Sequence, residues 1–238
     1  MNQKKFLTAE WRKLIMANYK VNPEILKPYL PAKTELDYFN DACYVSLVGF
    51  MFKEVSVKGF KIPWHINFPE VNLRFYVRYF ENNKWKRGVV FLSEIVPKPA
   101  ITLIANLLYR EHYSTMPMRY EWRKDDKEIN ISYQWKKKGN WNKLSVTAES
   151  IASPLIAGSE EEFITEHFWG YSNISTAKTA EYHVMHPRWG IYKVNNFTID
   201  CDFQKVYGKD FGFLQLQQPV SVFLAEGSAI EIFSKKVI

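Results

Sequence analysis

The sequence has few cysteines and no long apolar run, and each absence excludes a class of protein. Cys43 and Cys201 are its two cysteines, and neither belongs to a CxxC pair or to another metal-ligand spacing. The longest nearly apolar stretch, around Pro99–Tyr109, is too short to span a bilayer. The first residues lack the apolar segment of a signal peptide. We therefore expect a cytoplasmic protein with free thiols, without a disulfide framework and without a membrane partner.

Linkers, repeats and low-complexity tracts are also missing. The 10 glycines and 11 prolines among 238 residues are scattered, with no linker-like run. A chain of this length suits one large β domain, and we expect a single domain over residues 1–238. Aromatic residues make up 16% of the chain, and they favour strands.

The net charge of +7 raises the question of a nucleic-acid partner. The densest basic cluster is Lys136–Lys138, next to Gly139-Asn140, which is typical of a solvated hairpin tip. The sequence shows no recognition helix, zinc finger or RNA-binding sheet signature. We expect no nucleic-acid partner, and the sequence is compatible with a homo-oligomer.

The most informative stretch is the alternating segment within residues 64–80. Val71, Leu73, Phe75 and Val77 point to one side of the expected strand. The other side carries a carboxylate, an amide, a guanidinium and a phenol, from Glu70, Asn72, Arg74 and Tyr76. In an open sheet this polar row faces water, whereas in a closed barrel it faces a lumen and forms a binding site.

The remaining elements are also mostly strands. We expect a short helix over 9–13 after Thr8, and a helix from Pro99 to about His112 on an apolar period of 3.6. Ser159 and Glu162 form a capping box that opens a third helix. A three-stranded meander is expected over 118–149. Strands and helices do not alternate, which favours an antiparallel barrel or curved sheet with helices attached.

Several motifs resemble the uncharacterised YqjF-like proteins of the acetoacetate decarboxylase-like superfamily. The stretch 68–77 (FPEVNLRFYV) resembles the hallmark of that family, and Tyr19, Pro23-Glu24 and Leu30-Pro31 resemble its opening. The segment 186–189 (HPRW) resembles its late motif. The resemblance covers nearly the whole chain. It implies a mainly β fold, a cone-shaped antiparallel β-barrel with an internal cavity and a few peripheral helices.

One residue departs from the decarboxylases of that superfamily. The resemblance implies a lysine after the mid-chain helix that forms a Schiff base with a keto acid, and a glutamate that shapes its pocket. Glu70 corresponds to the glutamate. The position of the lysine falls near Glu111, His112 and Tyr113, where this chain has none, and Lys98 lies upstream in a Pro-Lys-Pro turn. We therefore expect no Schiff base.

The polar row supplies the candidate site. Arg74 offers a fork for a carboxylate or phosphate, and Glu70 is either a general base or the internal ion-pair partner of Arg74. His112 follows the mid-chain helix beside Tyr113, where a histidine either transfers protons near neutral pH or packs at the helix end.

The other histidines suggest a cavity mouth more than a metal centre. His183 and His186 are three residues apart, so on a strand they face opposite sides, and His167 precedes them. We expect no metal and no cofactor, and we expect His186 and Trp189 to line or close the cavity mouth.

Two functions of different classes follow. The first is a β-barrel that binds a small, anionic organic ligand through Asn72, Arg74, Tyr76, Tyr113, His186 and Trp189. The alternative is a cofactor-independent acid–base enzyme, lyase-like, that acts on a carbonyl compound through Glu70 and His112. The enzyme requires that both catalytic residues reach one ligand position.

Overall fold

The main sheet of the protein closes on itself. The computed structural model describes residues 4–109 and 112–238. Neighbouring strands follow the ring in the order β14 (Ser221–Phe233), β1 (Lys5–Val21), β3 (Cys43–Val57), β4 (Phe68–Glu81), β5 (Lys84–Val96), β10 (Trp169–Ser175) and β11 (Lys178–Met185). The ring closes where β11 pairs with β14. This arrangement agrees with the expected mainly β fold, and a closed ring is what a barrel requires.

Most strand pairs of the ring are antiparallel. The exception in the ring is β10, which pairs parallel to β5 through Trp169–Gly88 and Gly170–Val89. Short strands extend the ring strands: β2 (Glu35–Leu36) on β4, β6 (Tyr113–Thr115) on β5, β12 (Ile191–Tyr192) on β14 and β15 (Lys236–Val237) on β11.

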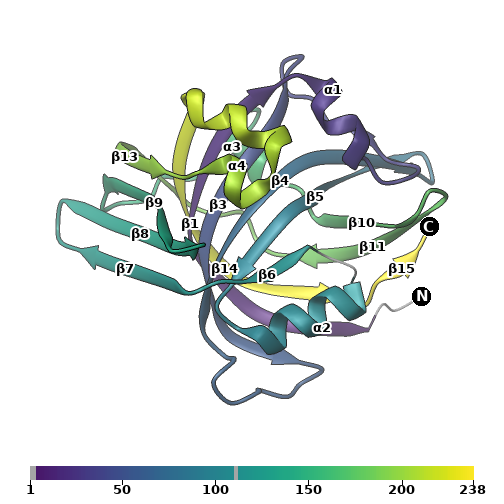
Figure 1. Ribbon diagram of the computed structural model, residues 1–238, viewed down its shortest axis with the longest axis horizontal. Helices are drawn as coiled ribbons and strands as arrows, with labels where there is room; N and C mark the ends of the chain where they lie inside the picture. The colour runs from purple at the N-terminus through teal and green to yellow at the C-terminus, as the bar shows by residue number, and fades with distance from the viewer. Residues whose placement is uncertain (1–3, 110–111) are drawn as a thin grey trace.

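A second sheet covers one outer face of the ring (Figure 1). Its strands run in the order β13 (Val194–Asp200), β9 (Asn140–Glu149), β8 (Glu128–Lys137) and β7 (Met118–Lys124). The expected meander is thus confirmed. Tyr133 and Trp135 of β8 share a buried apolar cluster with Val71 and Phe75 of β4.

Short helices cover the edge of the core between the two sheets and the ends of the ring. Four helices pack on the core between the two sheets: α1 (Pro23–Leu26), η1 (Lys27–Tyr29), α4 (Phe203–Tyr207) and η2 (Lys209–Leu216). Leu26, Phe203 and Phe211 belong to that buried cluster, and Tyr29 of η1 contacts Phe211 of η2. Helix α3 (Glu160–Thr165) begins at Ser159, whose hydroxyl accepts from the Glu162 amide, as the capping box predicts. Helix α2 (Pro99–Tyr109) crosses the ring at its other end. Within the described ranges, no helix is both long and apolar enough to cross a membrane.

Strand β4 alternates as the sequence predicts. Val71, Leu73, Phe75 and Val77 are buried in the core between the two sheets. Glu70, Asn72, Arg74 and Tyr76 point to the inside of the ring and are also buried. A strand with both faces covered therefore carries its polar residues inward.

The expected helix over 9–13 is wrong, because this stretch belongs to β1. Lys13 has a positive φ of 55° and forms a β-bulge, where the pairing with β3 shifts between Arg12 and Ile15. The bulge reverses the alternation. Trp11 lines the inside of the ring before it, and Leu14 does so after it. An extra residue of this kind interrupts the period of two, so the apolar spacing of the strand resembles that of a helix.

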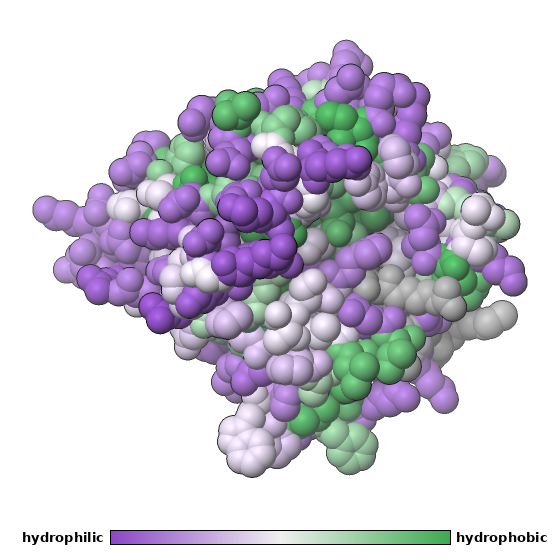
Figure 2. Space-filling model, in the orientation of Figure 1, coloured by the Kyte–Doolittle hydropathy of each residue, from purple (hydrophilic) through white to green (hydrophobic). Residues whose placement is uncertain are grey.

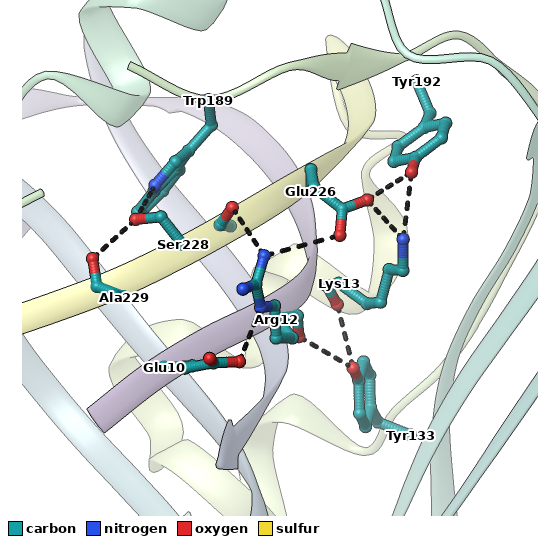
Figure 3. Close-up of polar contacts among 10 residues, drawn as sticks. Glu10, Arg12, Lys13, Tyr133, Trp189, Tyr192, Glu226, Ser228 and Ala229 are labelled. Atoms are coloured by element: carbon teal, nitrogen blue, oxygen red, sulfur yellow. Dashed lines mark hydrogen bonds and ion pairs between the residues drawn. The ribbon is translucent and has the colours of Figure 1, made fainter. Parts of the chain in front are cut away.

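A polar cluster holds the bulge in place (Figure 3). Lys13 Nζ contacts the Glu226 carboxylate and the Tyr192 hydroxyl. The Tyr133 hydroxyl donates to the carbonyl of Lys13 at 2.9 Å. Opposite the bulge, Gly227 has a φ of 78°, and a Cβ there would lie 1.9 Å from the carbonyl oxygen of Trp11. The cluster and the glycine together set the direction of Trp11.

Candidate functional site

The inside of the ring holds a cavity of about 70 Å³. It lies between β4 and the β10–β11 hairpin, and Thr165 of α3 reaches it. Three members of the polar row line it, Glu70, Asn72 and Arg74, together with aromatic residues. The other residues that line it and matter for its chemistry are Trp11, Glu94, Tyr113, His167, His186 and Trp189.

Glu70 is the titratable group at the centre of the polar row. Its side chain is buried; one carboxyl oxygen accepts from Asn72 Nδ2 at 2.9 Å and the other from the Tyr113 hydroxyl at 3.1 Å. Burial raises the pKa of Glu70 to about 7, although the two hydrogen bonds and the charge of Arg74 act against this rise. The carboxyl group therefore exists in both protonation states near neutral pH.

Arg74 is a buried cation without a carboxylate partner among the described residues. Its Nη2 donates to the carbonyl of Ile164 at 3.3 Å, and its guanidinium lies 5.6 Å from the ring centre of Tyr76. Its Nε has no hydrogen-bond partner. The expected alternative, an internal ion pair between Glu70 and Arg74, is not formed. A charge taken out of water without a counter-ion is costly, so the site favours an anion.

Further polar atoms around the cavity are also unpartnered. Asn72 Oδ1 is a buried acceptor, and Trp11 Nε1 is a buried donor. With Arg74 Nε and His167 Nδ1, they place four unsatisfied polar atoms on residues that line one cavity. Buried polar groups are normally paired, so this concentration marks the cavity as the candidate site for a hydrogen-bonding molecule.

His167 is a site residue that sequence reasoning did not single out as cavity lining. Its Nε2 contacts Asp37 Oδ2 at 3.1 Å, and Arg87 Nε donates to the same oxygen at 2.6 Å. Burial lowers the pKa of His167 to about 4, so the ring is neutral at pH 7. Its Nε2 then donates to the Asp37 carboxylate, which leaves Nδ1 as an acceptor. Asp37 and His167 are 130 residues apart in sequence, and no local pattern relates them.

His186 and Trp189 lie at the wall of the cavity, as expected from the sequence. Their rings stack at 4.2 Å, and Trp11 packs edge-on against Trp189. Trp189 Nε1 donates to Ser228 Oγ at 2.9 Å (Figure 3). Burial, with a further effect from Arg74, lowers the pKa of His186 to about 4. These residues form an uncharged aromatic part of the wall.

Tyr76 and His112 do not line the cavity. The Tyr76 hydroxyl hydrogen-bonds Ser46 Oγ at 2.7 Å, and its ring packs on Phe163. The side chain of His112 is exposed, and its Nδ1 lies 3.2 Å from the carbonyl oxygen of Phe91. The structure therefore does not bring His112 to the ligand position beside Glu70. Glu111, part of the segment expected to hold a lysine in relatives, lies outside the described residues.

The described residues contain no group of three or more His, Cys, Asp or Glu side chains that could hold a metal ion. His183, one of the three histidines considered from sequence, stacks on Trp169 at 4.5 Å and on Phe233 at 5.5 Å. The expectation of no metal stays a prediction.

A larger hollow, of about 410 Å³, lies on the outer face of the second sheet. Its lining includes the exposed residues Arg123 and Asn130. No buried titratable group lies among its described residues. The ring cavity, although smaller, is therefore the candidate functional site, because buried Glu70 and Arg74 line it.

Comparison with known sequences finds one family profile and a curated relative. A family described as an uncharacterized conserved protein, DUF2071, matches residues 8–229. The uncharacterized protein YqjF of Bacillus subtilis is 28% identical over 166 residues, which is 68% of this chain. The match spans 65% of that relative, just under two thirds of its length.

Comparison with solved structures finds the same fold in enzymes. Acetoacetate decarboxylase from Legionella pneumophila matches with a TM-score of 0.66 and 12% identity, over 98% of this chain and 87% of the other. An acetoacetate decarboxylase-like enzyme from Sphingomonas wittichii matches with a TM-score of 0.69 and 11% identity, over 99% and 94%. The enduracididine biosynthesis enzyme MppR, complexed with pyruvate, matches with a TM-score of 0.69 and 12% identity, over 100% and 91%. At such identities the likeness shows the fold, and the expected acetoacetate decarboxylase-like architecture is confirmed.

Proposed function

Because the chain belongs to the DUF2071 family of uncharacterized conserved proteins, whose description assigns no activity, we propose a function from its own site: it binds a small organic anion in the ring cavity. The anion lies against Arg74. Trp11 Nε1 is a second open donor for the anion among the described residues, whereas Asn72 Oδ1 and His167 Nδ1 are acceptors for a donor group elsewhere on the same molecule.

The observation that carries this proposal is the unpaired guanidinium of Arg74. Arg74 is 9% exposed, has no carboxylate partner among the described residues, and keeps a free Nε on a residue of the cavity wall. An anion that accepts from Nε supplies the missing counter-charge. Glu70 opposes this binding less as the pH falls below about 7, since its raised pKa of about 7 lets it become neutral there.

Binding in this proposal is not covalent. The described residues that line the cavity include no lysine, and Lys98 lies before α2 rather than in the wall. An imine needs a lysine amine beside the carbonyl carbon. The Schiff-base mechanism of the decarboxylases therefore has no nucleophile among these described residues.

The test is calorimetric titration with pyruvate, the molecule bound in the fold relative MppR. We expect the wild-type protein to bind pyruvate and Arg74→Met to lose at least about tenfold in affinity, because charged hydrogen bonds contribute about 1.5–3 kcal/mol. Arg78→Met is the matched control, since Arg78 lies on the same strand but pairs with Glu35 at the surface. Borohydride added with pyruvate should produce no adduct in the intact mass.

Equal binding by Arg74→Met and wild type would contradict the anion site. A stoichiometric borohydride adduct would contradict noncovalent binding. If pyruvate does not bind at all, acetate and acetoacetate extend the test to a smaller and a larger acid. Failure of all three would refute the proposal.

A second function, acid–base catalysis, is favoured by one observation. Glu70 has a pKa of about 7 and receives a hydrogen bond from Tyr113, which suits a general base. His112 does not line the cavity, so it cannot act beside Glu70 as this function required. Tyr113, whose hydroxyl contacts Glu70, takes its place as the proton donor. The assay is deuterium uptake by the methyl group of pyruvate in D₂O. Exchange catalysed by the wild type and lost in Glu70→Gln would establish an enzyme, whereas no exchange leaves a binding protein.

A further inference from the structure

A second, apolar pocket adjoins the polar cavity. It has a volume of about 140 Å³, twice that of the cavity, and lies between α2 and the end of the ring. Its wall is formed by apolar side chains of β1, β3, β4 and α2, among them Leu7, Val55, Phe68, Ile101 and Ala105. Five residues line both hollows and so form their shared boundary: Phe52, Glu94, Tyr113, Tyr182 and Ile232.

Strand β4 runs from the apolar pocket into the polar cavity. Phe68 lines the pocket, Glu70 follows at the boundary with Tyr113, and Arg74 lies deeper inside. A strand rises about 3.3 Å per residue, so Phe68 and Arg74 are roughly 20 Å apart along the backbone. A molecule that contacts both ends is elongated, with its charge at one end.

Helix α2 gives the pocket its outer wall. Ile101 and Ala105 face the pocket, whereas Leu103 and Leu107 are 61% and 71% exposed. The apolar surface over α2 is visible at the lower right of Figure 2. Asn106 fixes the helix to β6, since its side chain donates to the carbonyl of Tyr113 at 3.0 Å and accepts from the Tyr113 amide at 2.9 Å.

We propose that the ligand is a carboxylic acid with a flexible apolar chain, whose carboxylate lies at Arg74 and whose chain passes Tyr113 into the pocket under α2. This inference rests on the proposed anion site and adds the chemical class of its ligand. The argument is that the two hollows adjoin, with five wall residues in common, and that their chemistry is opposite. A short acid such as pyruvate fills the cavity and leaves the apolar pocket without a partner.

The test is a titration series of straight-chain acids from acetate to dodecanoate, below their micelle-forming concentrations. Each methylene that enters the pocket should raise the affinity about fourfold, since burial of one CH₂ contributes about 0.8 kcal/mol. The gain should stop when the pocket is full. Equal affinities for butanoate, octanoate and dodecanoate would overturn the inference.

Two variants of α2 locate the chain. Ala105→Phe fills the pocket, so the gain should stop at a shorter acid while acetate binds as before. Leu103→Phe adds the same ring to the exposed side of the helix and should change nothing. If Ala105→Phe leaves the whole series unchanged, the chain does not lie under α2.

The two proposals fail in different ways. Loss of binding in Arg74→Met with no dependence on chain length keeps the anion site and removes the apolar chain. A dependence on chain length that Arg74→Met does not alter indicates adsorption to an apolar surface, and it removes both proposals.

Discussion

At Glu70, burial and hydrogen bonding act in opposite directions on one carboxyl group. Its pKa of about 7 is well above the ordinary value of 4.5, because the loss of water outweighs the bonds from Asn72 and Tyr113. The folded protein therefore binds a proton at Glu70 over a pH range in which the unfolded chain does not. Stability must fall as this proton is removed.

The first prediction concerns this pH dependence. Between about pH 4.5 and 7 the folded state holds the proton and the unfolded state releases it, so the free energy of unfolding should decrease as pH rises. The decrease is on the order of a few kcal/mol, because the pKa rises from 4.5 to about 7 and each pKa unit corresponds to about 1.4 kcal/mol. Denaturant unfolding of wild type and Glu70→Gln, compared from pH 5 to 8, measures it, and the variant should lack this component.

The exposed residue Glu128 provides the control for the same substitution. Glu128→Gln should follow the wild-type pH profile. A Glu70→Gln profile that is parallel to the wild type would mean that Glu70 titrates at an ordinary pH in the folded protein.

At the scale of single elements, β4 and β1 show what the sequence could predict. Strand β4 has an unbroken period of two, because both of its faces are buried and each position has a fixed side. Its alternation placed Glu70, Asn72 and Arg74 on one face correctly, and the family resemblance, which implied a barrel, turned that face inward. The same rule predicted that Tyr76 also lines the cavity, which is wrong. Its side chain instead contacts Ser46 and Phe163, which belong to other elements, and so lies outside the cavity wall.

Strand β1 was not predictable in the same way. Its bulge at Lys13 depends on Glu226, Tyr192 and Tyr133, which lie far along the chain. A local period cannot report contacts at that separation. The same limit applies to the Asp37–His167 pair, which the sequence could not assemble. Tyr113 does line the cavity, and the family resemblance rather than a period pointed to its segment; its role as a ligand residue stays a prediction.

Gly227 provides a prediction about the bulge. Ala at this position combines a positive φ with a contact of 1.9 Å between its Cβ and the Trp11 carbonyl oxygen. We expect Gly227→Ala to lower the free energy of unfolding by about 2–4 kcal/mol, since backbone must move to relieve the contact. Chemical denaturation measures the loss.

Gly59→Ala separates the two causes. Gly59 also has a positive φ, of 87°, but its Cβ would meet no atom within 4 Å. This variant should lose only the backbone component, about 1 kcal/mol. Similar losses in the two variants would show that the bulge tolerates a side chain opposite Trp11.

At the scale of the whole molecule, the ring is unevenly joined. Within the described residues, β1 pairs with β3 and with β14 over most of its length, whereas the β10–β11 hairpin pairs with each ring neighbour through two residue pairs. Ion pairs strengthen the hairpin: buried Glu181 lies 3.0 Å from both Lys86 and Lys236. The hairpin is the part of the wall with the fewest backbone bonds to its neighbours.

We therefore predict faster hydrogen exchange in the β10–β11 hairpin than in β3, by about tenfold or more, because fewer bonds must open. Lys236→Met removes one ion pair of Glu181 and should raise exchange in the hairpin further. Lys193→Met is the control, since Lys193 pairs with Glu149 at the surface of the second sheet. Uniform protection around the ring would contradict this view of its wall.

If the proposed ligand binds in the polar cavity, the weakly joined hairpin also affects the time that it spends inside. Trp169, Tyr182 and Val184 of the hairpin line the polar cavity, so an occupant held there is enclosed by this part of the wall. If the wall must open for passage, opening limits entry and departure equally. Stronger pairing of the hairpin with its neighbouring strands would then slow association and dissociation by the same factor and leave the equilibrium constant unchanged. Residence time would then depend on the strand pairs that join the β10–β11 hairpin to β5 and β14, whereas affinity would depend on the residues around Arg74.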